Sequence, residues 1–385
     1  MTILTPQGFR AAGVAAGLKS AGGLDLALVV NDGPAHAAAG VFTRNKVKAA
    51  PVLWSQQVLT TGRLRAVVLN SGGANACTGP EGFQTAHATA EKAAEVLGCA
   101  PLEVAVCSTG LIGKQLPRAA VLAGVEAAVA GLGDDAAAAL AAATAIMTTD
   151  TVAKQAAHTA DGWSIGGTTK GAGMIAPSMA TMLTVLTTDA VVDSPVLDEA
   201  LRAAVRVSFD RLDVDGCMST NDTVLVLASG ASGVVADPVV FTEALAAVCR
   251  DLALQMQADA EGVTKRITVR VTGAATEDEA VTVARTIARD SLVKTAIFGS
   301  DANWGRIAAA AGYADAAVDP DRLDITVNGV LLCRGGVAAG GRTDADLSGK
   351  EVLVEVALGL GDGAADILTT DLSHAYVEEN SAYPS

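Results

Sequence analysis

The feature that most constrains the fold is an alternation of short apolar runs and longer alanine-rich segments along the whole chain. Runs rich in valine and leucine are typical of buried β-strands, whereas the alanine-rich segments have high helix propensity. Glycine-rich stretches separate the two kinds of segment. This mixture predicts a layered α+β or α/β fold, and the pattern alone does not decide between these topologies.

The apolar runs predict strands at 26–30, 64–69, 104–107, 182–187, 224–227, 267–271, 292–298, 323–332, 352–357 and 367–368. The helix-forming segments predict helices at 82–97, 117–130, 134–146, 196–207, 240–256 and 279–288. Residues 131–133 are expected to end the first of the two helices at 117–130 and 134–146, and the second helix begins directly after them. Hairpin-like turns are expected at 328–329 and 359–363.

One junction stands out, because a glycine-rich turn beginning at Lys170 runs into the strand whose first residue is Thr181. A threonine hydroxyl becomes a competent nucleophile when a base takes its proton, and one such base is its own α-amine, exposed by cleavage after Ala180. The simpler interpretation is a tight turn entering a buried strand. A phosphate-binding loop at 166–173 is disfavoured, since the segment matches neither glycine-rich nucleotide motif.

Composition narrows the function classes. A formal net charge of −15 and an isoelectric point near 4.6 argue against a nucleic-acid surface, which needs clustered Lys and Arg. No apolar run approaches 18 residues and no secretory signal is recognised at Met1, so we expect a cytoplasmic protein without a membrane span. The aromatic content of 3% and the many small residues predict close backbone packing.

Cysteine and histidine patterns offer no metal site. The cysteines form no C-x-x-C pair, so we expect reduced core residues rather than disulfides or ligands at positions 77, 99, 107, 217, 249 and 333. The four histidines are too far apart for zinc-binding motifs, and no G-x-S-x-G elbow supports a Ser-His-Asp hydrolase. A base other than histidine is therefore the simpler expectation.

Six segments, in order along the chain, resemble those of the ornithine acetyltransferase (ArgJ) family. They are NSGGANACTG (70–79), STGLIG (108–113), TTDT (148–151), KGAGMIAPSMATML (170–183), DVDGCMSTNDT (213–223) and NWGRI (303–307). The fourth is similar to the family's self-cleavage motif, KGxGMIxPxMATML. The resemblance covers essentially the whole chain, so it is far more specific than any single motif.

The resemblance implies a fold and a processing event. The fold would be an αββα sandwich of the DmpA/ArgJ type, with the nucleophile strand inside. Cleavage between Ala180 and Thr181 would give an N-terminal α chain, 1–180, and a C-terminal β chain, 181–385. Two α and two β chains would form a heterotetramer.

The resemblance also implies an activity, the transfer of acetyl from N2-acetylornithine to glutamate through an acetyl-threonine at Thr181, without a cofactor or metal. It leaves open whether acetyl-CoA is a second donor. The Thr109 hydroxyl and the Gly110 N–H would form the oxyanion hole. Substrate contacts would come from Thr148, Lys170, Thr181, Glu261, Asn380 and Ser385. Lys170 suits an amino-acid carboxylate and Glu261 its ammonium, although both residue types usually lie on the surface.

The C-terminal segment departs from the family ending near YVKINADYRT. Glu378 and Glu379 replace Lys and Ile, while Pro384 and Ser385 replace Arg and Thr. Asn380 is retained and Ser385 keeps a hydroxyl, so the local charge is what changes.

Two other functions stay open. A DmpA-type N-terminal-nucleophile aminopeptidase would pass the acyl group to water, but those enzymes are expected to carry serine where this chain has Thr181. A non-catalytic amino-acid-binding protein would remain an intact chain and form no covalent intermediate.

Overall fold

The structure is a computed structural model, and it describes residues 1–176, 182–341 and 343–382. The chain forms two compact units. The first takes in the described parts of Met1–Asp210 and Met218–Met256, and the second takes in Arg211–Cys217 and the described residues from Gln257 onward. Both units combine helices with sheets, so the predicted α+β class is confirmed. The predicted division after residue 180 concerns cleavage rather than compactness, and it stays a prediction.

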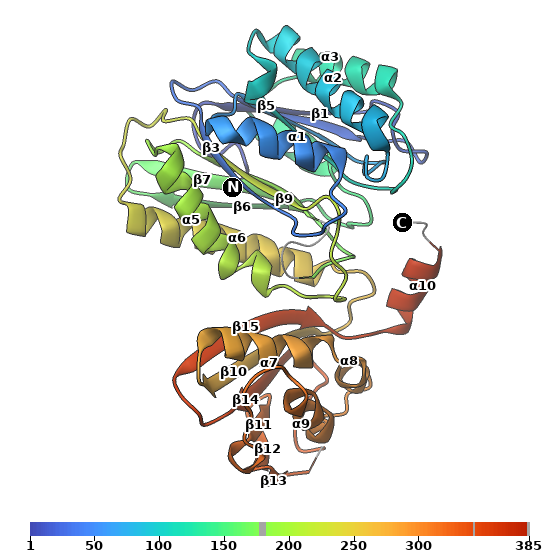
Figure 1. Cartoon of the computed structure of the whole chain (residues 1–385), viewed down its shortest axis with the longest axis vertical. Helices are drawn as coiled ribbons and strands as arrows, with labels where there is room; N and C mark the ends of the chain where they lie inside the picture. The colour runs from blue at the N-terminus through green and yellow to red at the C-terminus, as the bar shows by residue number, and fades with distance from the viewer. Residues whose placement is uncertain (177–181, 342, 383–385) are drawn as a thin grey trace. The chain divides into compact units, whose positions relative to one another are not determined.

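Two sheets make up the middle of the first unit (Figure 1). The four-stranded sheet has the order β1 (Phe9–Val14), β2 (Leu26–Asn31), β4 (Ala66–Asn70), β5 (Val104–Ser108). The five-stranded sheet has the order β3 (Ala37–Phe42), β9 (Thr223–Ala228), β8 (Leu183–Thr188), β7 (Trp163–Lys170), β6 (Lys154–Ala160). Strands β4 and β5 run parallel, as do β8 and β9, and the other pairs are antiparallel.

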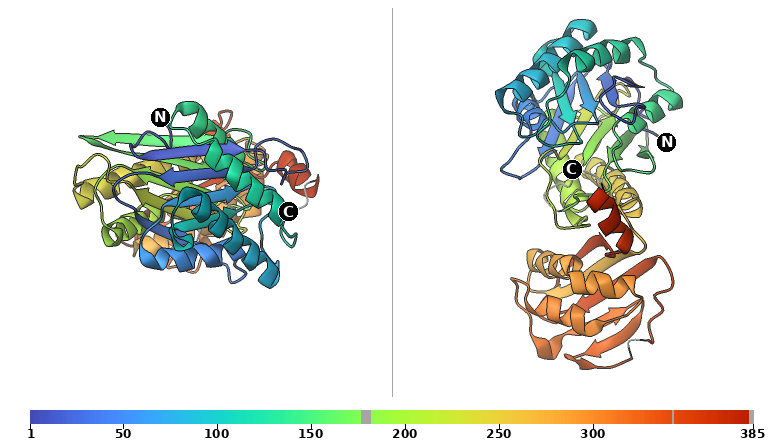
Figure 2. Two further views of the ribbon diagram at one scale, coloured as in Figure 1. Left: turned by 90° about the horizontal axis from the view of Figure 1, so that it is seen from above. Right: turned by 90° about the vertical axis from the view of Figure 1, so that its right-hand side faces the viewer.

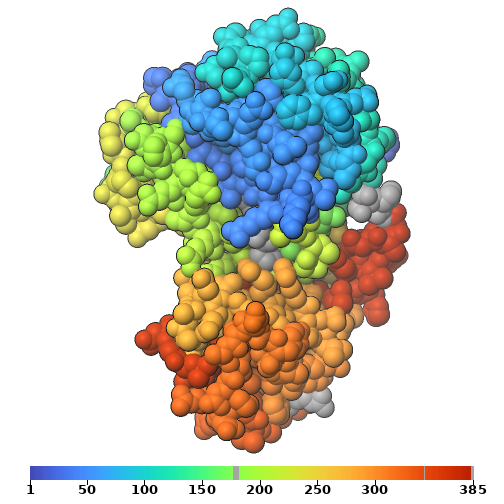
Figure 3. Space-filling view, viewed as in Figure 1, coloured from blue at the N-terminus to red at the C-terminus, as the bar shows by residue number. Residues whose placement is uncertain are grey.

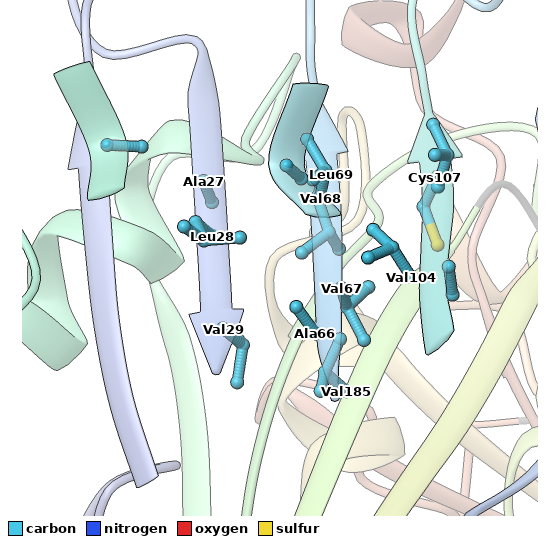
Figure 4. Packing of buried hydrophobic residues seen from close by; sticks show 14 of the residues in the cluster. Ala27, Leu28, Val29, Ala66, Val67, Val68, Leu69, Val104, Cys107 and Val185 are labelled. Atoms are coloured by element: carbon cyan, nitrogen blue, oxygen red, sulfur yellow. The ribbon is translucent and has the colours of Figure 1, made fainter. Parts of the chain in front are cut away.

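The two sheets of the first unit share one hydrophobic core. Leu183 and Val185 of β8 belong to the same buried cluster as the valines and leucines of β2, β4 and β5 (Figure 4). All six residues of β8 are buried, as expected for a central strand that is covered on both faces. The predicted strand at 182–187 is therefore confirmed, and it lies in the middle of its sheet.

Helices cover the outer faces of the two sheets and complete an αββα sandwich (Figures 1 and 2). On the side of the four-stranded sheet lie α2 (Gly79–Leu97) and α3 (Arg118–Ala130), and α4 (Ala136–Ala145) packs on β1 and β2. On the side of the five-stranded sheet lie α5 (Ser194–Arg206) and α6 (Pro238–Ala258). A side chain added at Gly167 of β7 would meet Leu252 and Val248 of α6.

Helix α1 (Ala50–Val58) protects the open edge of β5. The Trp54 Nε1–H donates to the Val104 carbonyl at 3.0 Å, and the Ser55 hydroxyl donates to the Val106 carbonyl at 2.7 Å. Unpaired groups on an edge strand otherwise invite pairing with another chain. The helix therefore satisfies backbone groups that the sheet leaves open.

Small residues allow the close backbone packing that the composition predicted. A Cβ atom at Gly13 of β1 would lie 2.1 Å from the Ala141 carbonyl oxygen of α4. Such an approach excludes any larger residue. The space-filling view shows the side chains closely packed over one face of each unit (Figure 3).

The second unit is built on one six-stranded sheet. Its order is β13 (Val337–Ala338), β12 (Val330–Arg334), β11 (Asp324–Val327), β14 (Glu351–Ala357), β10 (Arg266–Ala274), β15 (Gly363–Thr370). Helix α7 packs on β10 and β15, and its apolar residues join the core of the sheet. The helices of this unit are α7 (Glu277–Arg289), α8 (Ser291–Phe298), α9 (Trp304–Gly312) and α10 (His374–Ala382).

The predicted strand at 292–298 is wrong, because this segment is helix α8. The Asp290 side chain accepts the Val293 N–H and caps the first turn. Val293, Ala296 and Ile297 are buried at helical spacing, so one face of α8 contacts the core. A short β-branched run was mistaken for a strand although its cap and its spacing favour a helix.

The turn at 359–363 is not a hairpin either. It joins β14 to β15, but β10 lies between them, parallel to β14 and antiparallel to β15. The other predicted turn is correct: Asn328 and Gly329 both have positive φ and join the antiparallel pair β11 and β12. Local sequence gives the turn chemistry, whereas strand order depends on distant segments.

The cysteine prediction is only partly correct. Cys107, Cys249 and Cys333 are buried, but Cys77 and Cys217 are exposed and Cys99 is half-buried. The six are free thiols. Cys77 lies in a loop with a positive φ of 55°, so it is a turn residue rather than a core residue. Within the described ranges, no helix is long and apolar enough to cross a membrane.

Candidate active site

The predicted oxyanion-hole residues lie at the carboxyl end of β5, next to the end of its parallel neighbour β4. The Thr109 N–H donates to the Asn70 carbonyl at 2.9 Å, and the Thr109 carbonyl accepts the Gly73 N–H at 3.0 Å. The Asn221 side chain donates to the Ser108 carbonyl at 2.7 Å. These contacts fix the backbone of the turn before it leaves the sheet.

Gly110 has a conformation and surroundings that only glycine fits. Its φ is 124°, and a Cβ atom would lie 2.6 Å from the Gly73 nitrogen. Its N–H has no hydrogen-bond acceptor among the residues that the structure describes. An N–H left unpaired beside a fixed hydroxyl is the arrangement that an oxyanion hole requires.

Lys170 reaches the Thr109 hydroxyl from the end of β7. Its Nζ lies 3.2 Å from the Thr109 Oγ1, and the lysine is only 1% exposed. An ammonium group can donate hydrogen bonds but cannot accept them. The Thr109 oxygen must therefore accept from Lys170, so its single proton can be donated only to another group. The surface alternative for Lys170 is excluded.

A buried carboxylate, Asp150, forms hydrogen bonds with Thr148, Lys154 and Gly171. Its Oδ1 pairs with the Lys154 Nζ at 2.6 Å and accepts the Gly171 N–H at 2.7 Å. Its Oδ2 accepts the Thr148 N–H at 3.1 Å. Burial opposes ionisation, but the charges of Lys170 and Lys154, the hydrogen bond from Lys154 and the Gly171 N–H keep the pKa of Asp150 below its usual value. Asp150 thus joins the predicted residues Thr148 and Lys170.

The same carboxylate explains why the glycine-rich segment is not a phosphate cradle. Gly166 and Gly167 are buried within β7, and the Gly171 N–H is already bound to Asp150. A negative group at this position would repel a phosphate. In the described part of this segment, β7 ends at Lys170 and no helix follows through residue 176, as a phosphate-binding loop would require.

A second buried acid, Asp222, lies beside the start of β8. Its Oδ1 accepts the Met182 N–H at 3.2 Å. The side chain is fully buried, and burial raises the pKa of Asp222 well above its usual range. Sequence reasoning assigned no role to Asp150, Lys154 or Asp222, although both acids fall within the family-like motifs. The available signal was an acid directly before an apolar strand, as Asp222 stands before β9.

Two more of the predicted substrate contacts lie in the second unit and contact each other. The Asn380 Nδ2 on α10 donates to the Glu261 Oε2 at 2.9 Å. Asn380 is exposed and Glu261 is half-buried. This pairing gives the Glu261 carboxylate a fixed amide neighbour, which sequence reasoning did not anticipate. Ala180, Thr181 and Ser385 lie outside the described residues.

The described geometry thus joins Thr109, Thr148 and Lys170 within the first unit, and Glu261 with Asn380 within the second. In the first unit it offers two donors on successive residues, the Thr109 hydroxyl and the Gly110 N–H, and Lys170, which contacts Thr109, pairs with Leu183 at the start of β8. Such an arrangement can stabilise a developing oxyanion. Across the described chain, no cluster of three or more His, Cys, Asp or Glu side chains is arranged to hold a metal ion.

Comparison with known proteins gives a consistent result. A sequence model of the ArgJ family matches residues 10–385. The arginine biosynthesis bifunctional protein ArgJ of Mycolicibacterium paratuberculosis is 62% identical, over 100% of this chain and 96% of its own. The protein of the same name in Streptomyces coelicolor is 58% identical, with both chains covered completely.

Solved structures include an ornithine acetyltransferase complexed with ornithine from Mycobacterium tuberculosis. It is 63% identical to the matched part, which covers 46% of this chain and 94% of that chain, with a TM-score of 0.45. An arginine biosynthesis bifunctional protein ArgJ from Bacillus halodurans is 39% identical over 51% of this chain and 97% of its own, with a TM-score of 0.49.

Proposed function

The chain belongs to the ArgJ family, and on that premise we propose that it is an acetyltransferase of arginine biosynthesis. It moves the acetyl group of N2-acetylornithine to glutamate through an acetyl-threonine at Thr181. The observation that carries this proposal is the pair of donors at the end of β5, the Thr109 hydroxyl and the Gly110 N–H. Lys170 supports it, because its ammonium leaves the Thr109 proton available.

In the proposed first half-reaction, Thr181 attacks the acetyl carbonyl of N2-acetylornithine. The free α-amine of Thr181 takes the hydroxyl proton as the Oγ–C bond forms. The Thr109 hydroxyl and the Gly110 N–H stabilise the oxyanion of the tetrahedral intermediate. The C–N bond then breaks, ornithine leaves with a proton on its amine, and acetyl-Thr181 remains.

In the second half-reaction the amine of glutamate attacks acetyl-Thr181 and the same two donors stabilise the second oxyanion. The C–Oγ bond then breaks, N-acetylglutamate leaves, and the Thr181 Oγ regains a proton as the attacking nitrogen loses one through the α-amine. Such a two-step route requires neither a metal nor a cofactor. Thr148, Lys170, Glu261, Asn380 and Ser385 are the proposed substrate contacts. Opposite charges make Lys170 suitable for a substrate carboxylate and Glu261 for an ammonium group.

The free amine of Thr181 requires prior self-cleavage after Ala180. The proposal therefore includes two chains, 1–180 and 181–385, of 180 and 205 residues. They stay together because β7 and β8, which flank the cut, pair along six residues in one sheet. A heterotetramer of two copies of each chain, acetyl-CoA as a second acetyl donor and a cytoplasmic location complete the proposal. The word bifunctional in the names of the relatives supports a second activity.

The main alternative is a hydrolase of the aminopeptidase type. Identity of 62% over the whole chain with a bifunctional ArgJ protein favours the transferase. Threonine rather than serine at position 181 points the same way.

The test is intact mass spectrometry before and after incubation with N-acetylornithine. We expect the purified protein to be cut between Ala180 and Thr181, and the Thr181→Ala variant to stay whole. Without an acceptor, N-acetylornithine should give a stoichiometric burst of ornithine and add one acetyl group to the fragment that begins at Thr181. Turnover should then be slow until glutamate is added.

The same measurement separates the alternatives. Ornithine release at full speed without an amino-acid acceptor would identify a hydrolase and overturn the transferase proposal. An intact wild-type chain that still transfers acetyl groups would rule out the terminal amine as base. Replacing N-acetylornithine by acetyl-CoA tests the second donor, since glutamate acetylation with this donor alone is the expected result.

A further inference from the structure

The loop that joins β3 to α1 carries a concentration of positive charge (Figure 1). Arg44, Lys46 and Lys48 fall within five residues of a chain whose formal net charge is −15. Arg44 and Lys46 are exposed, whereas Lys48 is half-buried and its Nζ lies 3.5 Å from the Gln56 Oε1. Across the described ranges, none of these three cations forms an ion pair. Their charges are therefore available to an anionic ligand.

Two neighbouring loops extend this surface without adding any negative charge. The Ala50 N–H, directly after the first loop, donates to the Asn75 carbonyl at 3.1 Å, and the Gly113 N–H donates to the Ala76 carbonyl at 2.9 Å. Together the three adjacent loops contain four basic residues and no acid, in the ranges 43–49, 74–78 and 110–115.

The fourth basic residue is Lys114, which lies in the loop that follows the oxyanion donors. Its side chain is exposed, and it too forms no ion pair with any residue that the structure describes. We call residues 43–49 and 110–115 the basic loops. Clustered cations of this kind favour a ligand with several negative charges, because each charge adds to the same local potential.

Side-chain hydrogen bonds hold the first basic loop in place. The Thr43 hydroxyl donates to the Ser219 carbonyl at 2.8 Å, and the Asn45 Nδ2 donates to the Met218 carbonyl at 3.1 Å. The Asn45 Oδ1 accepts the Val47 N–H at 2.9 Å. The loop is thus pre-organised, so little conformational entropy is lost when a ligand binds to it.

The register of the five-stranded sheet places this loop at the same end as the oxyanion donors. Phe42, the last residue of β3, pairs with Thr223; Thr223 also pairs with Leu183, and Leu183 with Lys170. Lys170 contacts the Thr109 hydroxyl. Neighbouring strands lie about 4.8 Å apart, so the three steps across the sheet span about 14 Å. The second basic loop begins directly after Thr109.

Each basic loop also exposes an apolar side chain. Val47 is 52% exposed and Ile112 is 37% exposed. Cations next to apolar surface suit a ligand that joins phosphates to less polar groups, whereas a nucleic-acid backbone requires a longer stretch of cations than these loops supply. A nucleotide-linked acyl donor has this combination of phosphates and apolar parts.

We propose that the basic loops bind the phosphate groups of CoA and thereby hold acetyl-CoA for acetyl transfer. This inference rests on the proposed function, in which acetyl-CoA is the second donor. The ammonium and guanidinium groups recognise the diphosphate and the 3′-phosphate. The long pantetheine arm, which separates these phosphates from the thioester, spans the distance from the first loop to the oxyanion donors. N2-acetylornithine has no phosphate, so its use does not depend on the basic loops.

The first test is isothermal titration calorimetry with CoA and with pantetheine, which has the same thiol arm but no nucleotide phosphates. We expect CoA to bind the wild type more tightly than pantetheine does, and added salt to weaken CoA binding. The triple variant Arg44→Gln, Lys46→Gln, Lys114→Gln removes the three exposed charges. An exposed ion pair contributes up to about fivefold in affinity, so this variant should bind CoA at least about tenfold more weakly.

The second test is the acetylation of glutamate by different donors. The triple variant should raise the KM for acetyl-CoA at least about tenfold, by the same reasoning. The KM for S-acetyl-N-acetylcysteamine, a thioester without phosphates, and the KM for N-acetylornithine should stay at their wild-type values. Thermal unfolding monitors whether the variant is folded, and a general defect would raise all three values together.

Arg63→Gln is the matched control. Arg63 is also an exposed cation of the first unit, and its nearest polar partner is the His36 Nδ1 at 3.4 Å. It precedes the start of β4, whereas the oxyanion donors lie beside the end of that strand. Its substitution removes one surface charge at the opposite end of the sheet, so we expect CoA binding to stay as in the wild type.

The outcomes separate this inference from the proposed function. A wild type that binds CoA no more tightly than pantetheine, or a triple variant that binds CoA like the wild type, would overturn the inference. ATP that binds as tightly as CoA would overturn it as well, because the loops would then serve free nucleotides. If CoA binds through the basic loops but acetyl-CoA donates no acetyl group, the second donor of the proposed function is refuted while the binding site stands.

Discussion

Substitution of Asp150 by asparagine should lower the free energy of unfolding of the first unit by more than the removal of a solvent-exposed charge does. Both side chains of the Asp150–Lys154 pair are 0% exposed, and the charged atoms are 2.6 Å apart. Removing one partner of a buried pair leaves the other charge uncompensated, which costs about 3–5 kcal/mol. We expect the upper part of that range for Asp150→Asn, because Lys170 also loses a nearby opposite charge.

Lys154→Met should cost less, about 3 kcal/mol at the lower end of the same range, because Asp150 keeps the charge of Lys170 and the N–H groups of Thr148 and Gly171. The double variant should be more stable than the sum of the single effects predicts, since the methionine then replaces an uncompensated charge. A coupling free energy of roughly 2 kcal/mol or more between the two sites is the expected result of the double-mutant cycle.

The assay is urea unfolding followed by tryptophan fluorescence, in the Thr181→Ala background so that one chain unfolds. Asp198→Asn is the matched control, since Asp198 forms a pair with Arg202 at the same four-residue spacing but with side chains 43% and 61% exposed. Exposed pairs contribute about 0–1 kcal/mol. If Asp150→Asn costs no more than Asp198→Asn, the reasoning about the buried charge network is refuted.

Two other predictions concern activity and pH. Thr109→Ala should lower kcat about a hundredfold and leave KM little changed, as expected for the loss of one oxyanion donor. Thr109→Ser, which keeps the hydroxyl, should keep most of the activity. An unchanged kcat with a raised KM would instead make Thr109 a binding contact. Burial lowers the pKa of Lys294 from 10.5 to about 8, so the unfolded chain binds the Lys294 proton more tightly than the folded chain does. Between pH 8 and 10.5, the free energy of unfolding should therefore rise with pH by up to about 3 kcal/mol. This rise is measured relative to the Lys294→Met variant, which lacks the titrating group. Unfolding followed at Trp304 of the second unit measures this difference, and a constant difference across that pH range would contradict it.

Much of the fold followed from local pattern. The six predicted helices are present, because their apolar spacing and caps are properties of the segments themselves. The Asp135 side chain, for example, caps α4 by accepting the Ala138 N–H. The error at α8 arose where a short run of β-branched and aromatic residues fits both periods. The order of β14, β10 and β15 could not be read from the sequence, because it depends on which distant strands pair.

The sequence by itself determined the family, the helix and strand content and the expected chemistry, since motifs and periodicity are properties of neighbouring residues. It also marked Thr109 and Gly110 as the oxyanion hole and Lys170 as a substrate contact, but only through resemblance. The tertiary structure decided that the Lys170 ammonium touches the Thr109 hydroxyl, and that Asp150 and Asp222 are buried beside this turn and the start of β8. These properties depend on burial and on contacts between residues 40 to 61 positions apart, which the strand order brings together. Burial and nearby charges shift the pKa of an acid, so the opposite directions of the shifts at Asp150, where two lysine charges outweigh burial, and at Asp222, where burial dominates, exist only in the folded chain.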